Sequence, residues 1–263
     1  MNSKDIEEVE DFLENMAVEI EPYMNLFSGT SPAVLESDKP LSVFSITSFF
    51  PKIESLRAGI FEVAKLEEYY SLNVLFRAII EHFIKFQYML MRSSNQSDDE
   101  IGIDYWVFGQ DREIIDFAKS VRHAYRVLGI EGKYDVNEIL KKQGIISEEK
   151  SASRIRKKSE QFQFNNMVRY ISTQLEIEKS RNAQFLLMFF PKYSELSSCV
   201  HGGPESASAY ETGPERTEEA IRMSTFSSLM TRHYTFMTLY QYDKRFENLC
   251  KISKSYLERY CGA

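Results

Sequence analysis

The stretch Ser71–Met91, SLNVLFRAIIEHFIKFQYMLM, determines the fold because it is apolar almost all the way around a helix. A helix turns by about 100° per residue, and a helix that is apolar on every side is buried at the centre of a fold. Arg77 and Glu81 interrupt this pattern four residues apart, so they lie only about 40° apart around the axis. The main stripe contains Leu72, Leu75, Phe76, Ile79, Ile80, Phe83, Phe86 and Leu90, and the other side contains Val74, Ile84, Tyr88 and Met89.

The composition limits the classes of protein to which the chain can belong. With 263 residues, 43% of them hydrophobic, the chain can build a sizeable core. A net charge of −7 argues against a protein that coats nucleic acid, although a local basic patch can still bind RNA. We expect a cytoplasmic protein without a membrane span, because no long apolar run and no signal-peptide pattern occur. Cys199, Cys250 and Cys261 are odd in number and widely spaced, which favours reduced thiols.

Helical periodicity recurs along the chain, and no convincing alternating strand pattern appears. The sequence predicts one all-α domain over residues 1–263, an elaborated helical bundle whose core spans about 45–203. An N-terminal helix over 3–27 and a long C-terminal helix over 217–258, with a break near Asp243 as an option, pack on this core. The remaining expectations are a loop over 28–45, helices from about 47, over 71–91, 105–128, 135–143, 164–175 and 185–196, and a solvated helix or hinge over 147–160.

Two sequence patterns carry a resemblance to a known superfamily. Arg77 and His82 form R-x4-H, which resembles the signature of the HEPN superfamily of helical-bundle proteins. The segments LFRAIIE on the central helix and YSELSSCVHGG over Tyr193–Gly203 look like a divergent, HEPN-like bacterial family with an Arg-x3-Glu helix facing a histidine. The resemblance implies a polar cluster of Arg77, Glu81 and His201 in the bundle, with Tyr193 nearby. It also implies a metal-independent endoribonuclease that works as a dimer, in toxin or anti-phage defence systems.

Such a cluster has the groups for phosphodiester cleavage. Histidine exchanges protons near neutral pH and can take the 2′-hydroxyl proton, while a guanidinium stabilises charge on the phosphoryl oxygens. If the protein cleaves RNA, we expect Arg77 to stabilise the phosphate, His201 to act as general base or acid, and Glu81 to orient Arg77. Residues five apart on a straight helix diverge by about 140°, so His82 is the alternative base only if the helix kinks or a dimer completes the site. The competing interpretation is a structural Arg77–Glu81 ion pair with His201 capping helix carbonyls.

A basic run over residues 154–158 is the candidate RNA contact. Arg154, Arg156, Lys157 and Lys158 could follow a phosphate backbone, although flanking glutamates are also typical of a solvated arm. We expect no metal, because the four histidines lack HxxxH or HExxH spacing, and no cofactor, because phosphate-binding glycine loops are absent.

Two functions follow as hypotheses. The first is a HEPN-like protein that binds or cleaves RNA, such as tRNA, as a bacterial toxin or defence effector. The second is a non-catalytic scaffold that regulates a partner protein or pairs as a homodimer. In that case the C-terminal helix offers apolar residues for docking: Phe226, Met230, Phe236, Met237, Tyr240 and Tyr242.

Overall fold

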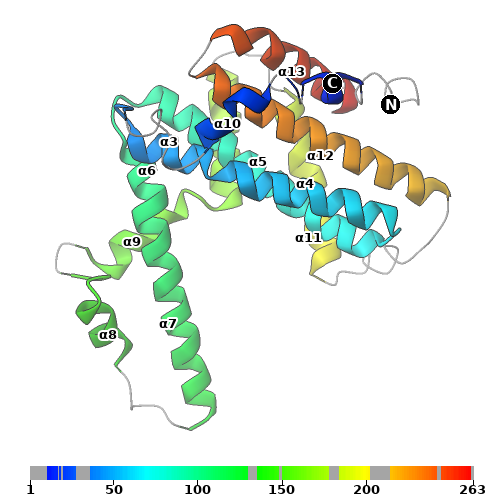
Figure 1. The fold of residues 1–263 in the computed structure, drawn as a ribbon. Helices are drawn as coiled ribbons and strands as arrows, with labels where there is room; N and C mark the ends of the chain where they lie inside the picture. Colours follow the sequence, from blue (N-terminus) through cyan, green and yellow to red (C-terminus); the bar gives the residue numbers. More distant parts are fainter. Residues whose placement is uncertain are drawn as a thin grey trace.

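The structure is a computed structural model that describes residues 11–16, 18, 20–27, 36–129, 135–147, 150–177, 184–201, 214–241 and 244–261. Helices dominate these residues and none of them forms a strand, so the prediction of an all-α helical bundle is confirmed. Figure 1 shows a bundle of long helices from which an arm, formed by α7, α8 and α9, projects to one side.

The central helix of the bundle is α5, Tyr69–Asn95, as the sequence predicts. Its side chains Leu72, Phe76, Ile79 and Phe83 are buried at 3% exposure or less. Leu75 of the predicted stripe and Val74 of the opposite side are half-buried. The long helices packed against α5 are α4 (Phe49–Lys65), α10 (Phe164–Ile177), α11 (Gln184–Val200) and α12 (Pro214–Tyr240).

The loop expected over residues 28–45 is wrong at its C-terminal end, because helix α3 spans Pro40–Thr47. Its exposed backbone N–H groups are satisfied from a distant part of the chain. The carboxylate of Asp99 accepts hydrogen bonds of 2.7 Å from the amides of both Leu41 and Ser42. Sequence periodicity does not reveal a helix whose cap comes from a residue almost sixty positions away.

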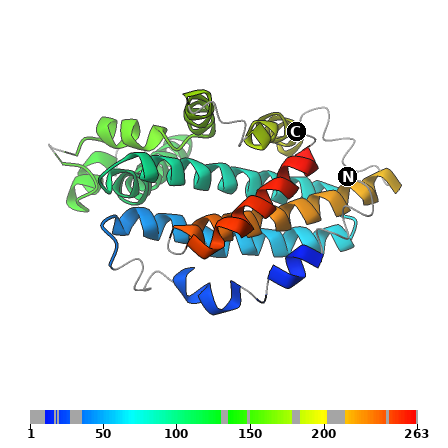
Figure 2. The same cartoon turned by 90° about the horizontal axis from the view of Figure 1, so that it is seen from above.

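The C-terminal segment 217–258 is two helices and not one. Helix α12 ends at Tyr240, a short 3-10 turn (η5, Lys244–Phe246) follows, and α13 (Glu247–Cys261) folds back onto α12. Figure 2 shows α13 crossing α12. The reversal packs one face of α13 against α12, since Leu257 is completely buried and His233 Nδ1 lies 2.9 Å from Ser253 Oγ. Asp243, the predicted break, lies outside the described residues.

The apolar side chains expected to dock a partner on this segment are largely used within the chain. Phe226, Met230 and Phe236 are buried in the main core, and Met237 and Tyr240 pack against it. Tyr242 lies outside the described residues.

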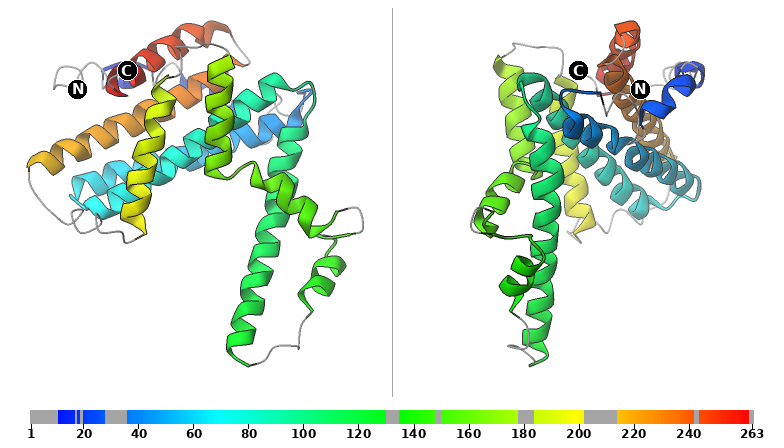
Figure 3. Two further views of the ribbon diagram at one scale, coloured as in Figure 1. Left: turned by 180° about the vertical axis from the view of Figure 1, so that it is seen from behind. Right: turned by 60° about the vertical axis from the view of Figure 1, so that its left-hand side comes forward.

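The arm begins where the chain leaves the bundle through a short helix, α6 (Glu100–Ile103), and a π-helical turn, η2 (Asp104–Phe108). Helix α7 (Gly109–Val127) then projects outward, and α8 (Val136–Lys142) and α9 (Ala152–Glu160) lie along it, as Figure 3 shows. The arm has a small core of its own, formed by Ile115, Leu140 and Ile155. The solvated segment expected over 147–160 is therefore helical over 152–160 and anchored by one buried isoleucine.

The N-terminal helix expected over 3–27 is only partly described. Residues 11–16, 18 and 20 are helical, and a 3-10 helix, η1 (Glu21–Phe27), follows. Residues 3–10 lie outside the described residues.

Candidate functional site

Arg77 and Glu81 lie together on α5, and Tyr193 of α11 bridges them. Arg77 Nη2 donates a 2.7 Å hydrogen bond to the Tyr193 hydroxyl, which in turn donates to Glu81 Oε2 at 3.3 Å. The direct ion pair is longer, with 3.9 Å between Arg77 Nη2 and Glu81 Oε2. The predicted Arg77–Glu81 pair is therefore present, but its strongest contact is the tyrosine hydroxyl on the neighbouring helix.

The surroundings of this cluster hold the three side chains in place. The Tyr193 ring stacks on Phe164 of α10, with centroids 3.6 Å apart, and the Arg77 guanidinium lies 4.8 Å from the ring centroid. Burial raises the pKa of Tyr193, and the Glu81 carboxylate raises it further against the opposing charge of Arg77. The hydroxyl therefore stays protonated and keeps bridging the two charges. The Arg77 side chain is 22% exposed, and its Nε is buried without a hydrogen-bond partner among the described residues.

His201, the proposed acid-base catalyst, lies elsewhere on the seam between α5 and α11. It is exposed at the residue that follows α11. The last turn of α11 meets the first turns of α5, where the Tyr70 hydroxyl donates to the Val200 carbonyl at 3.4 Å. Tyr193 and His201 are eight residues apart, which corresponds to about 12 Å along a helix. The structure therefore brings Arg77, Glu81 and Tyr193 together and leaves His201 about two turns away.

His82 faces a different part of the bundle. Its Nδ1 donates to the Ala78 carbonyl at 2.9 Å, and its ring packs edge-on against Phe49 of α4. Burial lowers the pKa of His82, with the charges of Lys85 and Lys52 adding to the effect. His82 and Arg77 lie in one continuous α-helix from Tyr69 to Asn95, and their side chains contact different neighbours, Phe49 of α4 and Tyr193 of α11.

The basic run lies on α9, and ion pairs engage part of it. Lys158 Nζ contacts Asp104 Oδ2 at 3.2 Å and Glu100 Oε1 at 2.5 Å, and its pKa is raised by these hydrogen bonds, mainly the one to Glu100. Arg156 Nε contacts Glu160 Oε1 at 3.1 Å. Arg154 and Lys157 are exposed. Lys158 thus has a structural role at the base of the arm, and Arg154 and Lys157 face solvent.

A buried polar chain lies at the base of the arm, and the sequence indicates it only weakly. Asp104 is 3% exposed and accepts a 2.8 Å hydrogen bond from Gln161 Nε2, while Gln161 Oε1 accepts one of 2.8 Å from the Tyr88 hydroxyl of α5. The only hint of it in the sequence is Asp104 between apolar neighbours, because the π-helical turn that directs this carboxylate inward has no sequence signature of its own.

The outer side of α7 carries apolar residues that nothing in the described part of the chain covers fully. Phe117 is 72% exposed, Leu128 is 70% exposed and Ile114 is 37% exposed. Val121 is half-buried and Ala124 is exposed. Their spacing of three and four residues places them on one side of the helix, as in one strand of a coiled coil. We call this set, Ile114, Phe117, Val121, Ala124 and Leu128, the α7 stripe.

The arm also differs in charge from the rest of the protein. Residues 109–160 contain 12 Lys and Arg against 9 Asp and Glu, whereas the remaining residues contain 20 against 30. The arm segment therefore carries +3 and the rest −10. Along α7 the charge is polarised. The first half carries Asp111, Glu113 and Asp116 against Arg112, a net charge of −2, and the second half carries Lys119, Arg122 and Arg126, a net charge of +3.

Two further kinds of site, a metal centre and a membrane span, are absent from the described residues. No group of three or more His, Cys, Asp or Glu side chains there could hold a metal ion. Among those same residues, no helix is both long and apolar enough to cross a membrane.

Comparisons of the chain with protein-family models, with curated proteins and with solved structures find no match.

Proposed function

We propose that the protein is a non-catalytic helical interaction module that pairs with a second copy of itself through the α7 stripe. The observation that carries the proposal is the exposed apolar stripe on a helix that projects from the bundle. Large apolar side chains at about 70% exposure, as at Phe117 and Leu128, are costly in water unless a partner covers them.

A second copy in antiparallel orientation fits the charge on α7. In that orientation the acidic first half of one helix, with Glu113 and Asp116, lies beside the basic second half of the other, with Arg122 and Arg126. A parallel pair would instead place like charges side by side. A twofold axis near Val121 makes the interface the same for both copies. Because α7 has 19 residues and is about 28 Å long, the two bundles would lie at opposite ends of the joined arms.

The Arg77 cluster supports a structural role at the centre of the bundle. Tyr193 and Glu81 engage the guanidinium of Arg77, and His201 lies about 12 Å from Tyr193 along α11. General acid-base catalysis needs its groups within hydrogen-bond reach of one reacting site, directly or through one water. This geometry favours the interaction module over the ribonuclease. A dimer would also agree with the resemblance to the HEPN superfamily, many of whose members work as dimers.

The test is the oligomeric state of the full chain measured by sedimentation across a range of concentrations. We expect a reversible dimer for the wild type and a monomer for Phe117→Ser, with unchanged helicity and unfolding. The matched control is Phe61→Ser, because Phe61 on α4 is 50% exposed and lies in the bundle. A monomeric wild type, or a dimer that survives Phe117→Ser and Leu128→Ser together, would overturn the proposal.

RNA binding by the arm is the second candidate, and the charge of the arm favours it. The +3 of residues 109–160 stands against −10 in the rest, and exposed Lys119, Arg122 and Lys157 face solvent. The charge variant Lys119→Gln/Arg122→Gln separates the two candidates. If the arm binds RNA, the wild type should bind tRNA in a salt-dependent way and the variant should not. If the arm only pairs, neither the wild type nor the variant should bind tRNA measurably.

A further inference from the structure

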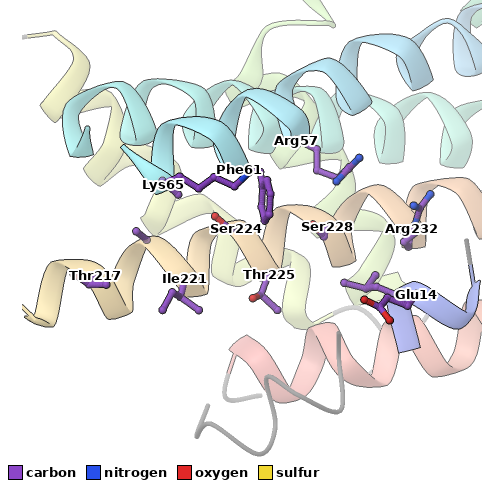
Figure 4. A pocket seen from close by; sticks show the side chains of 13 residues that line it. Glu14, Arg57, Phe61, Lys65, Thr217, Ile221, Ser224, Thr225, Ser228 and Arg232 are labelled. Carbon is purple, nitrogen blue, oxygen red and sulfur yellow. The ribbon is translucent and has the colours of Figure 1, made fainter. Parts of the chain in front are cut away.

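A groove lies on the bundle between α4, α12 and the N-terminal helix. Its volume is about 670 Å³, within the range of sites that hold small molecules. Figure 4 shows that side chains of α4 and α12 converge on it, with Glu14 of the N-terminal helix at one end. Its lining combines three cations, several hydroxyl groups and apolar side chains.

One end of the groove holds two arginines that share one carboxylate. Arg57 Nε contacts Glu54 Oε2 at 2.8 Å, and Arg232 Nη1 contacts Glu54 Oε1 at 3.5 Å. Arg57, Arg232 and Glu54 together carry a net charge of +1 before the Glu14 carboxylate at the same end is counted. The Arg232 side chain is only 17% exposed. Burial lowers the pKa of Arg232 and the charge of Arg57 lowers it further, although Glu54 opposes both effects. An anion bound here would therefore relieve a poorly solvated positive charge.

The same end also holds a competing carboxylate. Glu14 is exposed on the N-terminal helix, across the groove from Arg232 in Figure 4. With Glu14 included, this end of the groove has two arginines, Arg57 and Arg232, and two carboxylates, Glu54 and Glu14. An anion must therefore displace the Glu14 side chain into solvent, which an exposed side chain permits at little cost.

The middle of the groove is apolar, with a polar floor. Phe61 is 50% exposed and Ile221 is 44% exposed, and both line the groove. Ser224 Oγ is buried and has no hydrogen-bond partner among the described residues, although it lines the groove. A buried hydroxyl without a partner is costly. Lys65 closes the far end, where its Nζ contacts Glu62 Oε1 at 2.9 Å and lies 4.2 Å from the Phe61 ring centroid.

We infer that this groove binds an amphipathic anion, a molecule with a carboxylate or phosphate head and an extended apolar chain. The head would contact Arg57 and Arg232, and the chain would cover Phe61 and Ile221. From Arg232 to Ile221 is 11 residues of α12, or about 16 Å. This length requires an elongated ligand and excludes a compact one such as free phosphate from filling the groove. The inference concerns the bundle and is independent of the pairing of the arm.

Calorimetric titration with dodecyl phosphate and with dodecanoate, each kept below its micelle concentration, tests the inference. Dodecanol is the neutral comparator and inorganic phosphate is the head alone. We expect saturable binding of one molecule per chain for at least one of the two anions. Binding of dodecanol and of inorganic phosphate should be at least tenfold weaker.

Two arginines of α12 provide the matched variants. Arg232→Met removes a groove cation and should weaken binding at least tenfold. Arg222→Met removes an exposed arginine that pairs with Glu218 outside the groove lining, and it should bind as the wild type does. Ser224→Leu fills the groove without touching a charge and should also abolish binding. If Arg232→Met does not fold, Ser224→Leu still shows whether the anions bind in this groove.

Three results would overturn the inference. They are no saturable binding of either anion by the wild type, equal affinity for dodecanol, and equal effects of Arg222→Met and Arg232→Met in folded proteins.

Discussion

The hydroxyl of Tyr193 lies 2.7 Å from Arg77 Nη2, closer than the 3.9 Å that separates Arg77 from Glu81 on its own helix. The contact joins α11 to the central helix α5. Arg77 of α5 thus has a hydrogen-bond partner on a different helix, in addition to Glu81 on its own helix.

Tyr193→Phe should destabilise the fold by about 1 to 2 kcal/mol, because it removes hydrogen bonds to two charged groups and retains the stacking on Phe164. Unfolding in urea measures the change. Lys192→Ala on the same helix is the control, since its pairs with Glu195 and Glu219 are partly exposed and should be worth less than about 1 kcal/mol. Equal stability of Tyr193→Phe and the wild type would show that the hydroxyl contributes nothing.

Gly102→Ala should be among the most damaging single-methyl substitutions in the chain. A Cβ at Gly102 of α6 would lie 2.2 Å from the backbone nitrogen of Ser42, so α3 would have to move and loosen the cap that Asp99 provides. We expect a loss of about 2 to 3 kcal/mol. Gly109→Ala at the start of α7 meets no atom within 4 Å and should stabilise the helix by up to about 1 kcal/mol. Thermal unfolding of the pair tests the close approach, and losses of similar size would contradict it.

The sequence predicts the features of this structure that arise from residues close together in the chain, and it misses those that depend on contacts between distant residues. The apolar pattern of Ser71–Met91 predicts α5. The pattern Asp135-x-x-Glu138 is a helix-capping signature, and Asp135 caps α8 by accepting from the amides of Asn137 and Glu138. Gly129 and Gly144, with φ of +67° and +70°, end α7 and α8 where the glycines predict an end. Helix α3 was missed because its cap, Asp99, is distant in sequence.

In the candidate site, too, the sequence predicts the contact within one helix and not the arrangement of one helix against another. The Arg77–Glu81 pair follows from spacing on one helix, and it is present. The distance from Arg77 to His201 depends on how α11 lies along α5, which no motif encodes. The Arg57–Glu54–Arg232 group joins α4 to α12 and was missed. A signal existed in the sequence, because Arg232 is the only Lys, Arg, Asp or Glu among residues 223–240, which form most of α12.

His233 should make the protein less stable in acid. Burial lowers its pKa from 6.5 to about 3, with a smaller effect from the charge of Lys254. Below pH 6.5 the unfolded chain binds a proton at this residue that the folded chain does not bind. Stability is therefore complete above about pH 6.5 and falls as the pH drops toward 3, by up to about 1.4 kcal/mol per pH unit.

Urea unfolding of the wild type and of His233→Gln at pH 7.5 and pH 5 measures this contribution. The variant should lose less stability between the two pH values, whatever its stability at pH 7.5. His123→Gln, which alters an exposed histidine of α7, should keep the wild-type difference. An unchanged pH difference in His233→Gln would mean that His233 takes up its proton in the folded state as well.

The purified protein should leave RNA intact in excess EDTA. Arg77 is engaged by Tyr193, and His201 lies about two helical turns from that cluster, so the two residues are not arranged around one reacting phosphodiester. Incubation with total RNA and tRNA, analysed on denaturing gels, measures cleavage. Cyclic-phosphate ends that disappear in both Arg77→Ala and His201→Ala would instead establish the metal-independent ribonuclease and refute the non-catalytic proposal.

Ile155→Ala should unfold the outer part of the arm while the bundle stays folded. Ile155 is completely buried, but only in the small core with Ile115 and Leu140, so the cavity left by the substitution weakens contacts that do not extend into the bundle. We expect faster amide hydrogen exchange in α8 and α9 and unchanged exchange in the buried parts of α5 and α12. Ile139→Ala, at a position of α8 that is 40% exposed, should leave exchange in the arm nearly unchanged. Uniformly faster exchange in arm and bundle would show that the two unfold as one cooperative unit.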